Sequence, residues 1–108
     1  MQGFQITFYT QQDHRHHGQP VADWLLQIAG ELGLRGATVI AANEGIGHHH
    51  RLHAAHFLEL AEQPLAVVMA LSAEEAARLF ARVESAAVQV FYVKTAVEFG
   101  LLGAPPGT

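Results

Sequence analysis

Apolar and polar residues alternate with a period of two over residues 4–9 and again over residues 88–95. This period places every second side chain on the same face of an extended chain, so each segment is predicted to be a strand with one buried face. Residues 65–71 are apolar throughout, which favours a central strand that is covered on both faces. Residues 37–41 are predicted to form a further strand directly after the Arg-Gly pair that precedes them.

Two other segments show the spacing of helices. Pro20 suits a first helical position, and Gly33 suits a helix end in the left-handed conformation. The apolar face predicted between them consists of Val21, Trp24, Leu25, Ile28 and Leu32. A second helix is expected after Ser72, because a serine hydroxyl and the carboxylate of Glu75 can satisfy free backbone N–H groups reciprocally. The inward stripe of this helix is predicted to consist of Ala76, Leu79, Phe80 and Val83.

The order strand, helix, strand, strand, helix, strand predicts an α+β protein with the ferredoxin-like βαββαβ sandwich. We expect one domain over residues 1–95 and a C-terminal tail over residues 96–108 that packs in part and then frays. The connection between strands two and three, residues 42–64, is longer than a compact domain needs. It contains a Gly-Ile-Gly turn and five of the eight histidines, and its central part, residues 44–56, is the expected functional loop.

Composition adds an expectation about assembly and limits the choice of partners. The chain of 108 residues is 50% hydrophobic and 15% charged, whereas about 25% charged residues is typical, so we expect self-association to hide some surface. The net charge of −4 argues against a nucleic-acid partner, because the sequence shows no stripe of basic residues of the kind that binds a phosphate backbone. There are no cysteines, no secretory signal pattern and no apolar run long enough for a bilayer, so a cytoplasmic protein is expected.

Several short motifs resemble one known family over residues 4–94. They are Gly18 before the first helix, the run Gly-Leu-Arg-Gly-Ala-Thr-Val at residues 33–39, Gly-Ile-Gly at residues 45–47, and Pro-Leu at residues 64–65. Together they resemble the uncharacterised PII-like family known as domain of unknown function 190, related in fold to the nitrogen regulatory PII signalling proteins.

This resemblance implies a homotrimer whose sheets face inward. It also implies that residues 44–56 correspond to the mobile T-loop of PII-like proteins, and that a small ligand, often an adenine nucleotide, lies at the base of this loop between subunits. The loop then reports ligand occupancy to a partner, commonly a membrane transporter or an enzyme. Two features depart from the family pattern, namely the acidic Glu44 beside the glycine turn and the unusual number of histidines after it. Both weaken a direct transfer of a phosphate-binding role.

Ligand-binding candidates lie in three places. Gly45 and Gly47 allow the backbone to turn with positive φ, so that its N–H groups can form an anion-binding nest, although a simple hinge explains them equally well. Arg35, next to Gly36 at the junction of helix and strand, can clamp an anion, and its alternative partner is Glu31. The remaining candidates are Arg15 near the start of the first helix, where a basic solvated turn is the alternative, and His48 and Arg51 in the functional loop.

The histidines of the loop suggest an alternative function in divalent-metal binding. If a helical turn follows the glycines, His49, His53 and His56 fall on one face, and their imidazoles can bind zinc or nickel. His48 and His50 suit an extended segment instead. The simpler interpretation is a solvated loop whose histidines tune its charge.

Catalysis finds little support in the sequence. There is no cysteine nucleophile, and no serine is expected beside a histidine and a carboxylate. We therefore expect a PII-like signalling protein rather than an enzyme. It would bind a small anionic metabolite, most plausibly an adenine nucleotide, between subunits and report it through residues 44–56. The alternative is a trimeric divalent-metal-binding protein.

Overall fold

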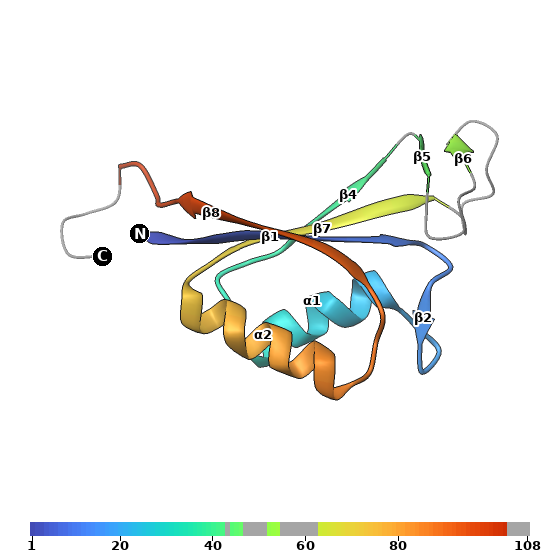
Figure 1. Ribbon diagram of the computed structural model, residues 1–108, viewed down its shortest axis with the longest axis horizontal. Helices are drawn as coiled ribbons and strands as arrows, with labels where there is room; N and C mark the ends of the chain where they lie inside the picture. Colours follow the sequence, from blue (N-terminus) through green and yellow to red (C-terminus); the bar gives the residue numbers. More distant parts are fainter. Residues whose placement is uncertain (43, 47–51, 55–62, 104–108) are drawn as a thin grey trace.

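The computed structural model describes residues 1–42, 44–46, 52–54 and 63–103. A four-stranded antiparallel sheet with the order β4-β7-β1-β8 lies over two helices that share one of its faces (Figure 1). The elements are β1 (Gln2–Gln11), β2 (Arg15–His16), β3 (Gln19–Pro20), α1 (Val21–Glu31), β4 (Thr38–Ala41), β5 (Glu44–Ile46), β6 (Leu52–Ala54), β7 (Pro64–Leu71), α2 (Ala73–Ser85) and β8 (Phe91–Glu98). This arrangement confirms the predicted α+β, ferredoxin-like fold.

The core lies between the sheet and the helices. Alternate residues of β1 and β7 point into it, and Ile6, Val67 and Leu71 are fully buried there. The helices contribute Val21, Trp24, Leu25, Ile28, Leu79 and Val83. Most of the face predicted for α1 and most of the stripe predicted for α2 are therefore confirmed, since a helix in a globular protein is stabilised by the apolar stripe that it buries. Leu32 of the predicted face lies just beyond α1, at its C-terminal cap.

Local signals set the ends of both helices as expected. Pro20 stands at the N-terminal cap of α1, one residue before the first helical position predicted for it, and Gly33 follows the helix with a φ of 67°. At α2 the N–H of Glu75 donates to the Ser72 hydroxyl at 3.1 Å, while the N–H of Ser72 donates to the Glu75 carboxylate at 2.9 Å. The predicted capping box is thus present, with both hydrogen bonds made.

The last strand differs from its prediction at both ends. It begins at Phe91 rather than at residue 88, and it continues through Glu98 instead of stopping at residue 95. The cause is the length of β1, which supplies a pairing partner for every residue from Phe91 to Glu98. The first residues of the expected tail therefore belong to the sheet, whereas residues 104–108 lie outside the described part of the chain.

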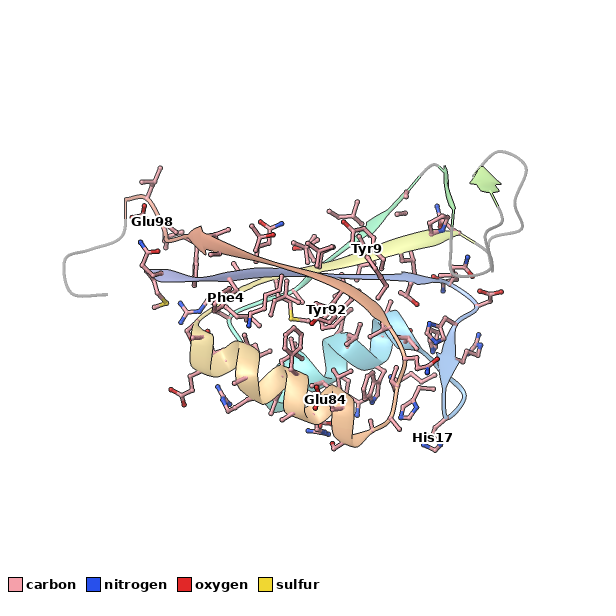
Figure 2. All side chains as sticks on the ribbon, viewed as in Figure 1. Phe4, Tyr9, His17, Glu84, Tyr92 and Glu98 are labelled. Atoms are coloured by element: carbon pink, nitrogen blue, oxygen red, sulfur yellow. The ribbon has the colours of Figure 1, made fainter. Side chains whose placement is uncertain are left out.

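The face of the sheet away from the helices carries apolar side chains in the single subunit. Tyr9, Phe91 and Val93 are 50%, 68% and 43% exposed, and Ile40 on β4 is 51% exposed. Figure 2 shows Tyr9 on this open side, and Phe4 and Tyr92 on the helix side. The expectation that β7 is covered on both faces is wrong for one subunit, because only its alternate residues are buried. Neither helix, within the described residues, is long and apolar enough to cross a membrane.

Candidate functional site

The root of the long connection, where the chain leaves β4 and enters β7, lies at one end of the sheet, which we call the loop end. There the N–H of Ala42 donates to the Pro64 carbonyl at 2.9 Å, so the segment between them leaves and returns at adjacent points. Gln11 at the end of β1 pairs with Pro64, and Phe91 at the start of β8 pairs with Tyr9 near that same end. The loop end therefore brings together β1, β4, β7 and β8 (Figure 1).

The described part of the functional loop is a short hairpin rather than a helix. Strands β5 and β6 pair antiparallel, with Glu44 opposite Ala54 and Gly45 opposite His53. The helical turn that would place His49, His53 and His56 on one face is therefore wrong at residues 52–54. These residues form a strand, and their backbone groups pair with those of β5 instead of forming helical hydrogen bonds. The other loop candidates, Gly47, His48, His49, Arg51 and His56, lie outside the described residues.

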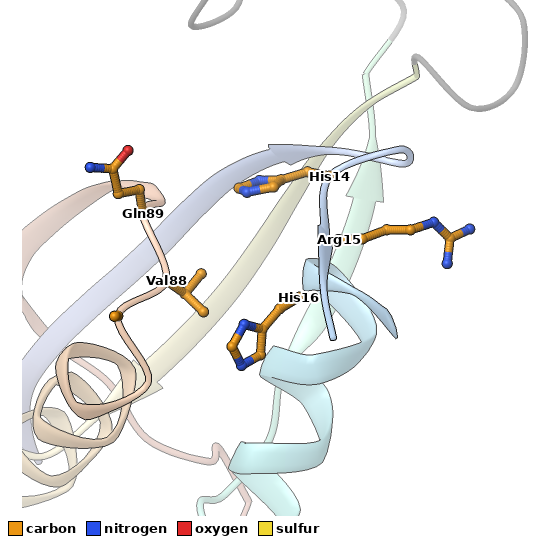
Figure 3. Close-up of a pocket in the computed structure, with 6 residues that line it drawn as sticks. His14, Arg15, His16, Val88 and Gln89 are labelled. Carbon is orange, nitrogen blue, oxygen red and sulfur yellow. The ribbon is translucent and has the colours of Figure 1, made fainter. Parts of the chain in front are cut away.

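A second hairpin, β2–β3, lies at the same end, between β1 and α1. Its turn holds His17 and Gly18 at φ values of 51° and 78°. Side chains alternate along a strand, so Arg15 points to the side opposite from its two histidine neighbours. The Arg15 guanidinium donates a hydrogen bond to the Gly18 carbonyl at 2.8 Å. In Figure 3 it points away from the neighbouring hollow.

This hollow has a volume of about 340 Å³ and lies between the β2–β3 hairpin and the loop that joins α2 to β8. The rings of His14 and His16 face it from the hairpin, and the Val88 side chain faces it from the loop, where Gln89 also lines it (Figure 3). The remaining lining residues are Arg15 and Ala87. Two imidazoles and a carboxamide offer donors and acceptors to a small polar ligand.

Two packing contacts hold these histidines in place. The His14 Nδ1 atom lies 3.0 Å from the Thr10 hydroxyl, which is buried in β1. The His16 ring lies 4.9 Å from the Trp24 ring, centroid to centroid, and Trp24 is part of the core. Sequence reasoning selected Arg15 and missed these neighbours. The alternation of histidine and arginine at residues 14–16 was the available signal, because in a strand it puts both histidines on one side.

Arg35 and Gly36 lie at the opposite end of the sheet from the loop end. They connect α1 to β4, next to the start of α2. The Arg35 Nε atom donates to the Glu75 carboxylate at 3.3 Å, and its guanidinium lies 5.5 Å from the centre of the Phe99 ring. One subunit therefore does not bring Arg35 and Gly36 together with Arg15 or Gly45.

The ion pairs around Arg35 differ from the expected one. Glu31 does not pair with Arg35 but accepts hydrogen bonds from Gln27 and Arg82, which lower the pKa of its carboxyl. The pKa of Glu75 is also lowered, chiefly by the hydrogen bond from the backbone of Ser72 and further by the charge of Arg35. Residues four positions apart are neighbours only within a helix, and Arg35 lies beyond the end of α1. The spacing that suggested Glu31 as its partner therefore does not bring the two side chains together.

No group of three or more histidine, cysteine, aspartate or glutamate side chains that could hold a metal ion occurs among the described residues. Of the three histidines of the predicted metal site, His49 and His56 lie outside these residues, and the site stays a prediction.

Comparison with known proteins identifies the family. The model of the family DUF190, described as uncharacterized ACR, matches residues 3–99, so the chain belongs to this family. The resemblance noted in the sequence is thereby confirmed. No curated protein matches the chain.

Solved structures share the fold at low sequence identity. A nitrogen regulatory PII-like protein from Thiomonas intermedia, bound to ADP, AMP and bicarbonate, has a TM-score of 0.69 and 12% identity. The similarity covers 94% of this chain and 91% of that one. A PII-like signaling protein from Thermus thermophilus has a TM-score of 0.66 and 17% identity, and covers 89% of this chain and 87% of that one. The architecture is therefore that of the PII-like proteins.

Proposed function

We propose that this chain is a PII-like regulatory protein rather than an enzyme. In this proposal a homotrimer binds a small anionic metabolite, an adenine nucleotide, in the clefts between its subunits. The observation that supports it most is the convergence at the loop end of the β5–β6 hairpin root, the β2–β3 hairpin and the loop between α2 and β8. The presence of ADP, AMP and bicarbonate in a structure of the same fold agrees with this choice of ligand.

Assembly into a trimer is supported by the open face of the sheet. The exposed side chains of Tyr9, Ile40, Phe91 and Val93 form an apolar surface that one subunit leaves in contact with water. Exposed apolar patches on a soluble protein mark interaction surfaces, since their burial releases the cost of hydrating them. Three such faces around one axis would cover one another.

The ligand would be held mainly by the backbone at the loop end. Gly45 and Gly47 would present N–H groups to its anionic part, with His48 and Arg51 beside them. Arg15 would contribute only after it releases the Gly18 carbonyl, with which it is now hydrogen-bonded. Arg35 and Gly36 would contribute only from a neighbouring subunit, since they lie at the other end of their own sheet.

Regulation would follow from the shape of residues 44–56. A ligand that binds one conformation of this loop more tightly shifts the loop toward that conformation. The size of the shift is set by the difference between the ligand's affinities for the two conformations. A partner that reads the loop, such as a membrane transporter or an enzyme, would then sense ligand occupancy. We place this activity in the cytoplasm.

Thermal unfolding of the full chain with a panel of ligands tests the proposal. AMP, ADP and ATP, each with and without bicarbonate, are compared with GMP as a matched control and with zinc and nickel. A true ligand at 100 times its Kd stabilises the folded state by about 2.7 kcal/mol. We expect adenine nucleotides to raise the Tm and Gly47→Val to abolish that rise, while Gly30→Ala, a change in α1 with open space around it, retains it.

Three results would contradict the proposal. The first is the absence of any shift with adenine nucleotides at millimolar concentration. The second is a shift with zinc or nickel alone that His53→Ala removes, which would favour the metal-binding alternative. The third is a monomer by light scattering, because an inter-subunit cleft needs two subunits.

A further inference from the structure

Residues on the open face of the sheet lie in rows across the paired strands. The row nearest the loop end is apolar apart from one hydroxyl and consists of Ile40, Ala66, Tyr9 and Phe91. The second row alternates threonine and valine and consists of Thr38, Val68, Thr7 and Val93. The third row consists of Ala70, Gln5 and Thr95. The open face therefore changes from aromatic to carboxamide and hydroxyl groups with distance from the loop end.

Gln5 lies in the middle of the third row. Tyr9, which Figure 2 shows on the open side of the sheet, is four positions away on the same strand, so Gln5 shares that face. The residue is exposed in the single subunit. Within the described part of the chain, its carboxamide makes no hydrogen bond to another residue. Its N–H donors and its carbonyl oxygen can therefore bind a partner outside the subunit.

The neighbouring strand leaves room for this side chain. β1 and β7 are the two inner strands of the sheet. The residues that β7 presents to the open face are only alanine and valine, namely Ala66, Val68 and Ala70. The longer Gln5 side chain therefore projects beyond those of β7 from the middle of the sheet.

The dimensions of the sheet place its middle near the axis of the proposed trimer. Strands lie about 4.8 Å apart, so a sheet of four strands is roughly 19 Å wide. If three such sheets form a triangle around one axis, the middle of each lies about 5.5 Å from the axis, which is half the spacing of ~10 Å between packed sheets. Side chains of the inner strands then meet at the axis, and Gln5 lies beside its two copies.

We propose that the three Gln5 carboxamides of the trimer form a closed ring of hydrogen bonds around its axis. This ring requires the homotrimer proposed above. Three-fold symmetry repeats every donor and acceptor, so an N–H of one carboxamide that reaches the carbonyl oxygen in the next subunit does so three times and closes the ring. The ring satisfies a polar group that a packed interface would otherwise leave without water and without a partner.

The ring would fix the height of the three subunits along the axis. Displacement of one subunit by a row separates its carboxamide from the other two and leaves donors and acceptors unpaired inside the interface. The apolar row at Tyr9 gives no such directional preference, because hydrophobic burial is roughly proportional to area alone. A single buried polar side chain sets the register of coiled coils in the same way. Gln5 is thus assigned as a residue that determines the specificity of assembly.

Two substitutions of Gln5 test the ring by sedimentation equilibrium of the full chain. Gln5→Asn keeps the carboxamide but shortens its reach, so we expect the trimer dissociation constant to rise roughly 100-fold or more, because three polar groups stay buried and unpaired. Gln5→Met keeps the length without a polar group and should weaken the trimer much less than Gln5→Asn. Gln2, exposed near the start of the same strand, provides the matched controls Gln2→Asn and Gln2→Met, which should leave the constant unchanged.

Equal effects of Gln5→Asn and Gln5→Met, or none from either, would overturn the ring and leave the trimer of the proposed function intact. Side-chain amide hydrogen exchange by NMR provides a second measurement, which needs no variant. In the trimer the Gln5 carboxamide should exchange at least about tenfold more slowly than that of Gln2, and equal rates would contradict the proposal. A monomeric wild-type chain would overturn the proposed trimer as well as the ring.

Discussion

The capping box of α2 allows one prediction to be worked out in detail. Ser72→Ala removes the hydroxyl that accepts the Glu75 N–H at 3.1 Å and leaves that N–H without its partner. Loss of such a cap costs about 1 kcal/mol. The helix cannot avoid this cost by fraying, because Ala76 in its first turn is buried in the core. The loss should therefore appear in global unfolding, as a fall in Tm of roughly 4 °C for a domain of about 100 residues.

Two variants provide matched comparisons for Ser72→Ala. Ser85→Ala, at the other end of α2, removes a hydroxyl that donates to the Arg82 carbonyl at 2.9 Å, and this exposed change should cost less than about 0.5 kcal/mol. Ser72→Asp restores an acceptor at the cap and should recover most of the stability. Urea unfolding at one protein concentration measures all three, since assembly adds a concentration-dependent contribution. Equal losses in Ser72→Ala and Ser85→Ala would refute the reasoning.

Three further predictions concern stability. Gly3→Ala should destabilise the fold by about 1–3 kcal/mol in urea unfolding, because its Cβ would lie 2.2 Å from the Leu71 carbonyl oxygen; an unchanged midpoint would contradict this. Leu79→Ala should cost about 2–5 kcal/mol by the same assay through the cavity it leaves, and a loss below 1 kcal/mol would show that the core refills. The lowered pKa of Glu75 contributes stability that is present above its ordinary value of 4.5 and is lost as the pH falls through the lower folded value. Glu75→Gln should therefore flatten the acid side of the stability–pH curve, and an identical acid limb in both proteins would contradict this assignment.

The sequence by itself determined both helices, the order of the four strands of the main sheet along the chain, and the family. The alternation in β1, the apolar face of α1 and the capping box at Ser72 are local signals, because each depends on residues a few positions apart along the chain. Gly33 marked the end of α1 for the same reason, since its φ of 67° favours glycine. The glycine motifs and the long connection after the second strand were sufficient to identify the PII-like family.

The tertiary structure decided which residues meet. Arg35 pairs with Glu75, 40 positions away, rather than with Glu31, because the packing of α1 beside the start of α2 sets that contact. The hollow lined by His14 and His16 exists only where the β2–β3 hairpin meets the loop after α2. The bounds of β8 likewise follow from its register with β1. Such contacts join segments that are distant in the chain, and only the packing of the whole domain brings them within the few ångströms at which hydrogen bonds and ion pairs act.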